Sequence, residues 1–332
     1  MTDIPSGTLA LVRDAMLRWA REAGLVAEPG EERRLAAMRL QVLVGGALPQ
    51  GDVADVALAA QWAAFICWVD DQIDRRGLGS VPGELEQFTA PLRQVLAPGE
   101  GASGVAAAHA VVLARLWERT AAGMSAPWRA RFTTDYLDFL DACELEVALR
   151  RSGARLPLTA YLALRRRTIT LLPMLDVLEH AGHAEFVEDS RVDAQLRDLR
   201  WAVADVVGWA NDLASAVDDE VAGQDNLVAV LARQDGCTTD AARTRVAAMI
   251  EERRAGFITA AAGLRTAPLL PADRQEDLRR YVDLVERFMA ATLHWLTVTG
   301  RFHPYPETMR HPPSTSRGPA PASAGRPADE LN

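Results

Sequence analysis

Apolar residues recur every three or four positions along most of the chain, the spacing that gathers them on one face of an α-helix. Val, Ile and Thr form no series of short alternating runs, which would indicate strands. The pattern predicts helices within residues 1–30, at 31–43, 52–75, 105–122, 126–152, 157–180, 190–222, 238–264 and 271–300, and one short helix in the Gly- and Pro-rich segment 77–104. We therefore predict an all-α protein.

A change in composition marks the end of the folded domain. From Met309 onward the chain holds five prolines among many Ser, Ala and Gly residues. Such a segment buries too little apolar surface to fold. We expect one helical domain over residues 1–308 and a disordered tail over 309–332.

Charge and cysteine content exclude several classes of function. A net charge of −9 argues against a nucleic acid partner, because phosphate backbones select basic surfaces. The three cysteines are scattered and form no CxxC motif, which fits a reducing cytoplasm. The N-terminus lacks the pattern of a secretory signal. The longest apolar stretch, 56–69, is too short to cross a bilayer, so we expect no membrane insertion.

The most apolar helix ends in the acidic string FICWVDDQIDRR. Asp70 and Asp74 are four residues apart, so they share one helical face about 6 Å apart along the axis, with Asp71 beside them. Carboxylates this close repel unless a cation lies between them, and Mg²⁺ prefers such oxygen ligands. Ile66 and Cys67, one turn earlier, extend this face as an apolar wall. The alternative is a solvated helix end whose acids pair with the two arginines after them.

A second polar stripe lies in the string WANDLASAVDDE. Asn211, Ser215 and Asp219 are spaced i, i+4 and i+8, which places them in one row along a helix. An amide oxygen, a hydroxyl and a carboxylate are three oxygen ligands suited to one Mg²⁺. The alternative is an ordinary polar helix face. Two such stripes in one helical protein favour two rims of one cavity, each bringing metal to a shared anion.

Together the two strings, DDQID and NDLASAVDD, resemble the paired metal-binding motifs of bacterial class I terpene synthases. Arg165 lies 46 residues before Asn211, at the usual place of the family's diphosphate-sensing arginine. Arg301 lies 90 residues after Asn211, at the place of its late Arg-Tyr pair. The stretch Gly223–Val228 also resembles the segment directly after the second motif in that family. The resemblance covers about residues 15–306.

This resemblance implies a helical bundle around a deep central cavity and a Mg²⁺-dependent terpene cyclase. The substrate it implies is an isoprenyl diphosphate, with farnesyl diphosphate as first choice and geranylgeranyl diphosphate as second. The enzyme would ionise it and close the carbocation into a cyclic hydrocarbon or alcohol; a homodimer is left open. Three Mg²⁺ ions are implied, held by Asp70, Asp71, Asp74, Asn211, Ser215 and Asp219.

The resemblance also assigns catalytic roles near a predicted helix break. By position, Arg165 is the diphosphate sensor, Thr168 a linker and Ile169 an effector whose backbone carbonyl faces the cavity. Pro173 supports this assignment, because it has no amide hydrogen for the Ile169 carbonyl four residues earlier. A plain proline kink is one alternative. Arg166 replaces Arg165 as sensor if the helix is rotated.

A cation in the pocket requires apolar and aromatic walls. The residues expected to contact substrate, besides Arg165, Arg301 and Thr168, are Phe65, Ile66, Trp68 and Trp295, with Trp62 as a further aromatic candidate. For Trp62, Phe65 and Trp68 the alternative is simple core packing. Trp295 is the preferred wall residue because it lies six residues before Arg301.

Three positions depart from the family pattern. Asp219 stands where Glu is usual, Asp218 where Lys is frequent, and Phe302 where the family has Tyr. The alternatives to a cyclase are a chain-elongating prenyltransferase-like protein, a prenyl diphosphate-binding protein and a catalytically inactive helical homologue. An elongase would carry a second DDxxD motif, and a class II cyclase a DxDD motif, neither of which we find.

Overall fold

The computed structural model describes residues 5–75, 78, 83–97, 107–186, 190–266 and 270–302, apart from the side chains of Asp74 and Arg75. These residues form α-helices and no strand, which confirms the predicted all-α class. The helices are α1 (Ser6–Glu22), α2 (Pro29–Ala37), α3 (Leu40–Ala47), α4 (Val53–Arg75), α5 (Glu84–Leu96), α6 (Ala108–Ala121), α7 (Ala126–Ser152), α8 (Leu158–Thr168), α9 (Leu171–Ala181), α10 (Asp193–Ala222), α11 (Leu227–Asp235), α12 (Thr239–Thr266) and α13 (Ala272–Val298).

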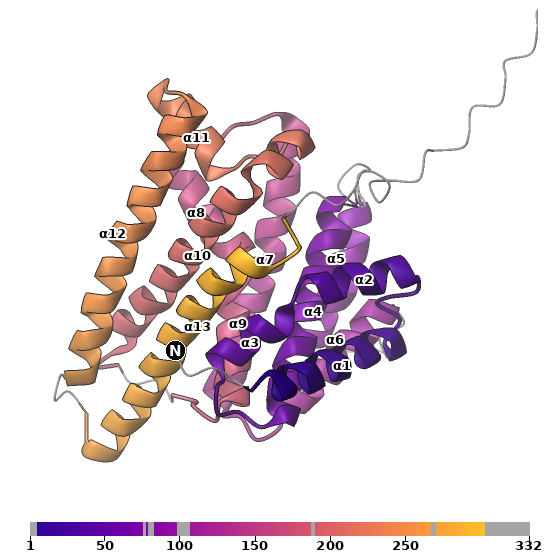
Figure 1. Cartoon of the computed structure of the whole chain (residues 1–332), viewed down its shortest axis with the longest axis vertical. Helices are drawn as coiled ribbons and strands as arrows, with labels where there is room; N and C mark the ends of the chain where they lie inside the picture. Colours follow the sequence, from indigo (N-terminus) through magenta and orange to yellow (C-terminus); the bar gives the residue numbers. More distant parts are fainter. Residues whose placement is uncertain are drawn as a thin grey trace, which may run out of the picture. The chain divides into compact units, whose positions relative to one another are not determined.

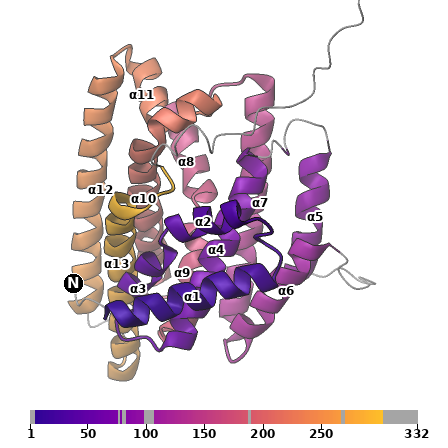
Figure 2. The same cartoon turned by 45° about the vertical axis from the view of Figure 1, so that its right-hand side comes forward.

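Helix α4 runs through the middle of the bundle. In Figures 1 and 2 it lies between α12, α10 and α13 on one side and α5 and α6 on the other. The window Val53–Ile73 has the length and hydropathy of a membrane span, contrary to our estimate from 56–69, but 67% of it is buried within the bundle. Its apolar side chains therefore build the core. The tail expected at 309–332 lies outside the described residues.

The expected helix over 31–43 is wrong, because the chain breaks between α2 and α3. Arg39 adopts a left-handed φ of 53° there, although no glycine or proline marks the break. The reason is tertiary. The Met38 carbonyl accepts hydrogen bonds from Trp295 Nε1 (2.6 Å) and Thr299 Oγ1 (3.0 Å), and the Ala37 carbonyl accepts one from the Gly300 amide (2.8 Å). The end of α13 thus terminates α2.

Two further helix boundaries differ from the prediction. The expected helix over 157–180 is two helices, α8 and α9, and the sequence pattern missed α11. Pro173 lies in the first turn of α9, where an amide hydrogen has no helical acceptor. Asn226 begins α11, since its Oδ1 accepts a hydrogen bond from the Val228 amide (2.9 Å).

A buried ionic cluster fixes α9 against α7 and α10. Arg200 of α10 donates to Asp176 (2.9 Å) and Glu179 (3.2 Å) of α9 and to Asp135 (2.7 Å) of α7. Arg131 of α7 donates to the same two α9 carboxylates, at 3.0 and 2.6 Å. Because both α9 carboxylates are fully buried, their charges require these arginines. The cluster therefore holds the second half of α9 against α7 and α10.

This cluster holds three carboxyl groups and two guanidinium groups, so one proton would balance its charge. Burial raises the pKa of Asp135 from 3.8 to about 7 and that of Glu179 from 4.5 to about 8. The folded protein therefore binds more protons than the unfolded chain at intermediate pH. The contribution of these two groups to the free energy of unfolding therefore falls as pH rises from about 5 to about 8.

We predict that the melting temperature decreases over this pH range and that Glu179→Gln flattens the decrease. Each retained proton contributes a slope of about 1.4 kcal/mol per pH unit, which a neutral side chain lacks. Thermal unfolding followed by circular dichroism between pH 5 and 8 measures it. The exposed Glu251→Gln is the matched control and should keep the wild-type slope. An equal slope in Glu179→Gln and wild type would contradict the prediction.

Candidate active site

Asn211, Ser215 and Asp219 form the predicted row on α10. The Ser215 hydroxyl donates to Asp219 Oδ2 at 2.6 Å, and it also lies 3.0 Å from the Asn211 carbonyl. Burial raises the pKa of Asp219, while the hydrogen bonds from Ser215 and Asn226 oppose that rise. Three oxygen-bearing side chains thus lie along one helical face, partly shielded from water.

Arg165 of α8 approaches the head of this row. Its Nη2 donates to Asn211 Oδ1 at 2.8 Å, and its Nε donates to Asp212 at 2.7 Å. The Thr168 hydroxyl lies 3.4 Å from Nη1. Arg165 therefore contacts both the expected linker residue and Asn211, the first residue of the α10 row. The last turn of α8 therefore carries a guanidinium group directly to the second motif.

Arg166, the alternative sensor, points elsewhere. It forms a two-pronged ion pair with Asp205, at 2.8 and 3.0 Å, and its guanidinium lies 4.9 Å from the centre of the Trp201 ring. Arg253 shares the same carboxylate at 2.9 Å. The geometry therefore favours Arg165 over Arg166 as the arginine of the site.

Sequence reasoning missed the residues that hold Arg165 in place. Asp212 is 2% exposed, and its carboxylate accepts hydrogen bonds from Arg165, from the Tyr161 hydroxyl (2.7 Å) and from the Leu227 amide (3.0 Å). Burial and the Asp212 carboxylate raise the pKa of Tyr161, so the phenol remains a neutral donor. Asp212 is part of the second motif in the sequence. Its role was not apparent there, because its carboxylate is oriented by Arg165 and Tyr161 of α8 and by Leu227 of α11.

The break between α8 and α9 lies against α10. Thr170 has a left-handed φ of 60°, which a β-branched residue rarely adopts, and this turn separates the two helices. A Cβ added to Gly208 of α10 would lie 3.6 Å from Arg165 Cγ and 3.8 Å from the Ile169 side chain. Ile169 and Arg165 therefore share one close contact with the helix that carries the second motif.

Arg301 lies on the first motif. Its guanidinium pairs with Asp70 and lies 3.2 Å from Asp71. The Arg301 side chain is 12% exposed, whereas Asp70 is 36% exposed. Asp74 follows on the last turn of α4, and its side chain lies outside the described residues. The chain thus brings the late arginine to the first acidic motif across 231 residues.

The aromatic candidates on α4 do not share the face of Asp70. Trp68 precedes Asp70 by two residues, which places it about 160° around the helix. Its ring contacts Phe65 (6.2 Å between ring centres), and Phe88 and His109 of α5 and α6. Phe65 is fully buried. We correct the assignment of both residues, because Trp68 packs against α5 and α6 and Phe65 is part of the buried core.

Two other tryptophans also have structural partners. Trp62 is fully buried and donates to the Thr120 hydroxyl at 2.8 Å, so it too belongs to the core. Trp295 is 6% exposed, binds the Met38 carbonyl and lies edge-on to Phe302. Ile66, by contrast, is half-buried and lies one turn before Asp70 on the same helical face.

The donor atoms of both motifs fit a hard divalent cation. Carboxylate, amide and hydroxyl oxygens are the ligands that Mg²⁺ takes, usually completed by water. Within the described part of the chain, no three His, Cys, Asp or Glu side chains gather as a metal site. The α10 row instead combines one carboxylate with two neutral oxygens, so it could hold a cation whose other ligands are water or phosphate.

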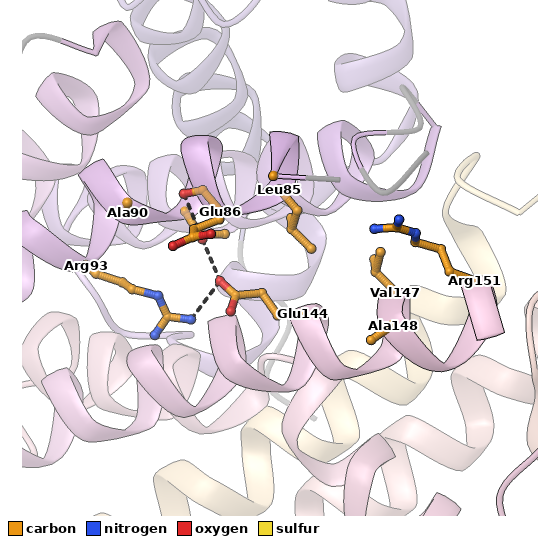
Figure 3. A pocket seen from close by; sticks show the side chains of 10 residues that line it. Leu85, Glu86, Ala90, Arg93, Glu144, Val147, Ala148 and Arg151 are labelled. Atoms are coloured by element: carbon orange, nitrogen blue, oxygen red, sulfur yellow. Dashed lines mark hydrogen bonds and ion pairs between the residues drawn. The ribbon is translucent and has the colours of Figure 1, made fainter. Parts of the chain in front are cut away.

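A separate cleft of about 320 Å³ lies between α5 and α7. Figure 3 shows Arg93 and Glu144 across it, joined by an ion pair of 2.9 Å, with Arg151 at the far end. None of the predicted site residues lines this cleft. It is therefore distinct from both acidic motifs.

Comparisons with known proteins agree with this geometry. A family model described as terpene synthase family 2, C-terminal metal binding, matches residues 61–255, more than half of the chain. Pristinol synthase from Streptomyces pristinaespiralis is 31% identical over 299 residues, which cover 87% of this chain and 80% of that protein. A (−)-β-caryophyllene synthase from Saccharothrix espanaensis, described as cyclising (2E,6E)-farnesyl diphosphate, is 29% identical over 76% of this chain and 71% of its own.

A solved structure shares the fold as well. Linalool/nerolidol synthase from Streptomyces clavuligerus, in complex with 2-fluorogeranyl diphosphate, superposes with a TM-score of 0.78 at 27% identity. The superposition covers 87% of this chain and 98% of that one. The family model spans both acidic motifs and Arg165. The chain therefore belongs to the terpene synthase family.

Proposed function

We propose that this terpene synthase ionises farnesyl diphosphate in a Mg²⁺-dependent reaction and cyclises the carbocation. The observation that carries the proposal is the bond between Arg165 and Asn211, because it joins a guanidinium group to the head of the oxygen row on α10. A cation and an arginine side by side form a site for a diphosphate. The names of the farnesyl-cyclising relative and of the geranyl analogue complex support a prenyl diphosphate as its ligand.

The two motifs would hold the metal from opposite rims of one cavity. Asp70, Asp71 and Asp74 would contribute carboxylates from α4, and the α10 row would contribute its three oxygens. Bound Mg²⁺ ions, three by family resemblance, would supply Lewis acidity toward the diphosphate oxygens. The side chains of the two motifs would fix the positions of these positive charges around the diphosphate.

Both arginines would bind the leaving group. When the allylic C–O bond breaks, both electrons of that bond leave with the diphosphate, so negative charge grows on its oxygens. Arg165 and Arg301 would donate hydrogen bonds to these oxygens, where the growing charge strengthens them. Arg301 is already close to the metal ligands through its pairing with Asp70, so binding would require only an exchange of partners.

The carbocation that remains must be kept from water. Ile66 and Cys67 are half-buried beside Asp70 and would begin an apolar wall below the metal rim. Ile169 would turn its backbone carbonyl toward the cation, since the chain changes direction at Thr170. The carbonyl dipole would then stabilise the positive charge without removing a proton from the carbocation.

The cellular setting is also a proposal. None of the three cysteines, Cys67, Cys143 and Cys237, is joined in a disulfide, which supports a reducing cytoplasm. We also propose a homodimer, which light scattering can test. Neither assignment affects the chemistry proposed for the site.

We expect purified protein with Mg²⁺ to convert farnesyl diphosphate into a cyclic hydrocarbon or alcohol. The measurement is gas chromatography with mass spectrometry of a hexane extract, run in parallel with geranyl and geranylgeranyl diphosphates. If only geranylgeranyl diphosphate gives a cyclic product, the proposed cyclisation stands, but the proposed substrate is wrong. Longer diphosphates formed only with isopentenyl diphosphate would indicate a chain-elongating enzyme. If no substrate is converted, the protein is an inactive homologue.

Asp70→Asn should lower kcat/KM at least a hundredfold, because the amide is a poor Mg²⁺ ligand and removes one of the two carboxylates that pair with Arg301. Steady-state release of diphosphate as a function of Mg²⁺ concentration measures this loss. Asp141→Asn is the matched control, since Asp141 pairs with Arg93 near the separate cleft. A wild-type rate in Asp70→Asn would show that Asp70 is no metal ligand.

Arg165→Lys should also lose at least a hundredfold in kcat/KM, because lysine cannot reach Asn211 and Asp212 at once with a planar group. Arg166→Lys should stay within about fivefold of wild type, since Arg253 still compensates Asp205. The same kinetic assay compares the two variants. If both variants lose kcat/KM equally, the assignment of Arg165 rather than Arg166 as the diphosphate-binding arginine is wrong.

A further inference from the structure

Asn226, at the start of α11, uses every polar position of its side chain. Its Oδ1 accepts from the Val228 amide at 2.9 Å, and its Nδ2 donates to the Asp212 carbonyl at 2.8 Å and to Asp219 Oδ2 at 2.7 Å. Both partners of Nδ2 can only accept, so the orientation of the amide is fixed. The residue is 2% exposed. A helix cap needs only the Oδ1 contact, so the other two bonds require a different explanation.

The second of these bonds restrains the carboxylate of Asp219. Ser215 and Asn226 both donate to Oδ2, at 2.6 and 2.7 Å, and neither bond uses Oδ1. Two donors on one oxygen fix the plane of the carboxylate and favour its ionised form. Asp219 is one methylene shorter than the usual Glu, so the direction of its remaining oxygen decides whether it can reach a cation.

Asn226 is itself held rigidly by its neighbours. Asp225 pairs with Arg155 at 2.8 Å and with Arg233 at 3.1 Å. On the other side, the Leu227 amide donates to Asp212, the carboxylate that anchors Arg165. The loop between α10 and α11 is therefore tied at three consecutive residues. Through it, the oxygen row and the sensor arginine share one rigid support.

We propose that Asn226 is a positioning residue that turns Asp219 Oδ1 toward the cation of the α10 row. The inference rests on the proposed function, since it assigns that row to a metal. Residues that orient metal ligands through hydrogen bonds typically affect affinity tenfold to a hundredfold. Asn226 would thus compensate for the short side chain at position 219 by holding it in the one direction that binds.

Asn226→Ser separates this role from helix capping, because serine is a good N-cap but has no amide donor that reaches Asp219. Ser125→Ala is the matched control, since Ser125 caps α7 through the Trp128 amide (3.2 Å) and lies on another helix. Isothermal titration of Mn²⁺ into the full chain, in the presence of inorganic pyrophosphate, measures affinity without turnover. Thermal unfolding measures the cap.

We expect Asn226→Ser to bind Mn²⁺ ten to a hundred times more weakly at a near wild-type melting temperature. Ser125→Ala should melt earlier and bind Mn²⁺ normally. If Asn226→Ser does not fold, Asn226→Thr keeps a hydroxyl cap without the amide donor and without added charge, and it should also bind Mn²⁺ ten to a hundred times more weakly. If the folded Asn226 variant binds Mn²⁺ as tightly as the wild type or more tightly, the role of Asn226 is wrong, while the proposed function still stands. Absence of pyrophosphate-dependent Mn²⁺ binding in the wild type overturns both the inference and the proposed function.

Discussion

Carboxylates gathered beside an apolar interior repel one another unless a cation stands between them. Among the described residues, arginines meet that constraint at both motifs and in the core. Arg301 lies at the first motif, Arg165 at the second, and Arg200 with Arg131 in the core. The first two leave oxygen atoms at a partly exposed surface, where a metal can join them. The third is buried, and its two arginines lie against carboxylates of α7 and α9, so it fixes these helices against α10.

The end of α13 links fold and site. Trp295, Thr299 and Gly300 satisfy carbonyls at the end of α2, and the chain then delivers Arg301 to Asp70. The same contacts that terminate one helix therefore set the position of a proposed catalytic arginine. Changes at Trp295 would act on the site through this support, since its indole is bound within the core.

The proposed role of Asn226 would accommodate a departure from the family pattern at the second motif. The carboxylate at 219 is one methylene shorter than the usual Glu, and Ser215 and Asn226 both donate hydrogen bonds to its Oδ2. Restricting a ligand before the cation binds reduces the entropy lost on binding. The α10–α11 loop, and not the helix alone, thus completes the oxygen row.

The sequence by itself determined the all-α class, most helices and the two acidic stripes, because helical spacing is a local property that 3.6 residues per turn dictates. It could not predict the left-handed turns at Arg39 and Thr170. The turn at Arg39 follows carbonyls that are bound by the distant end of α13. Nor could the sequence show that Trp68 faces α5 and α6, or choose between Arg165 and Arg166, because one residue of rotation separates those outcomes. Tertiary structure decided which arginine meets which carboxylate, since those contacts join segments up to 231 residues apart.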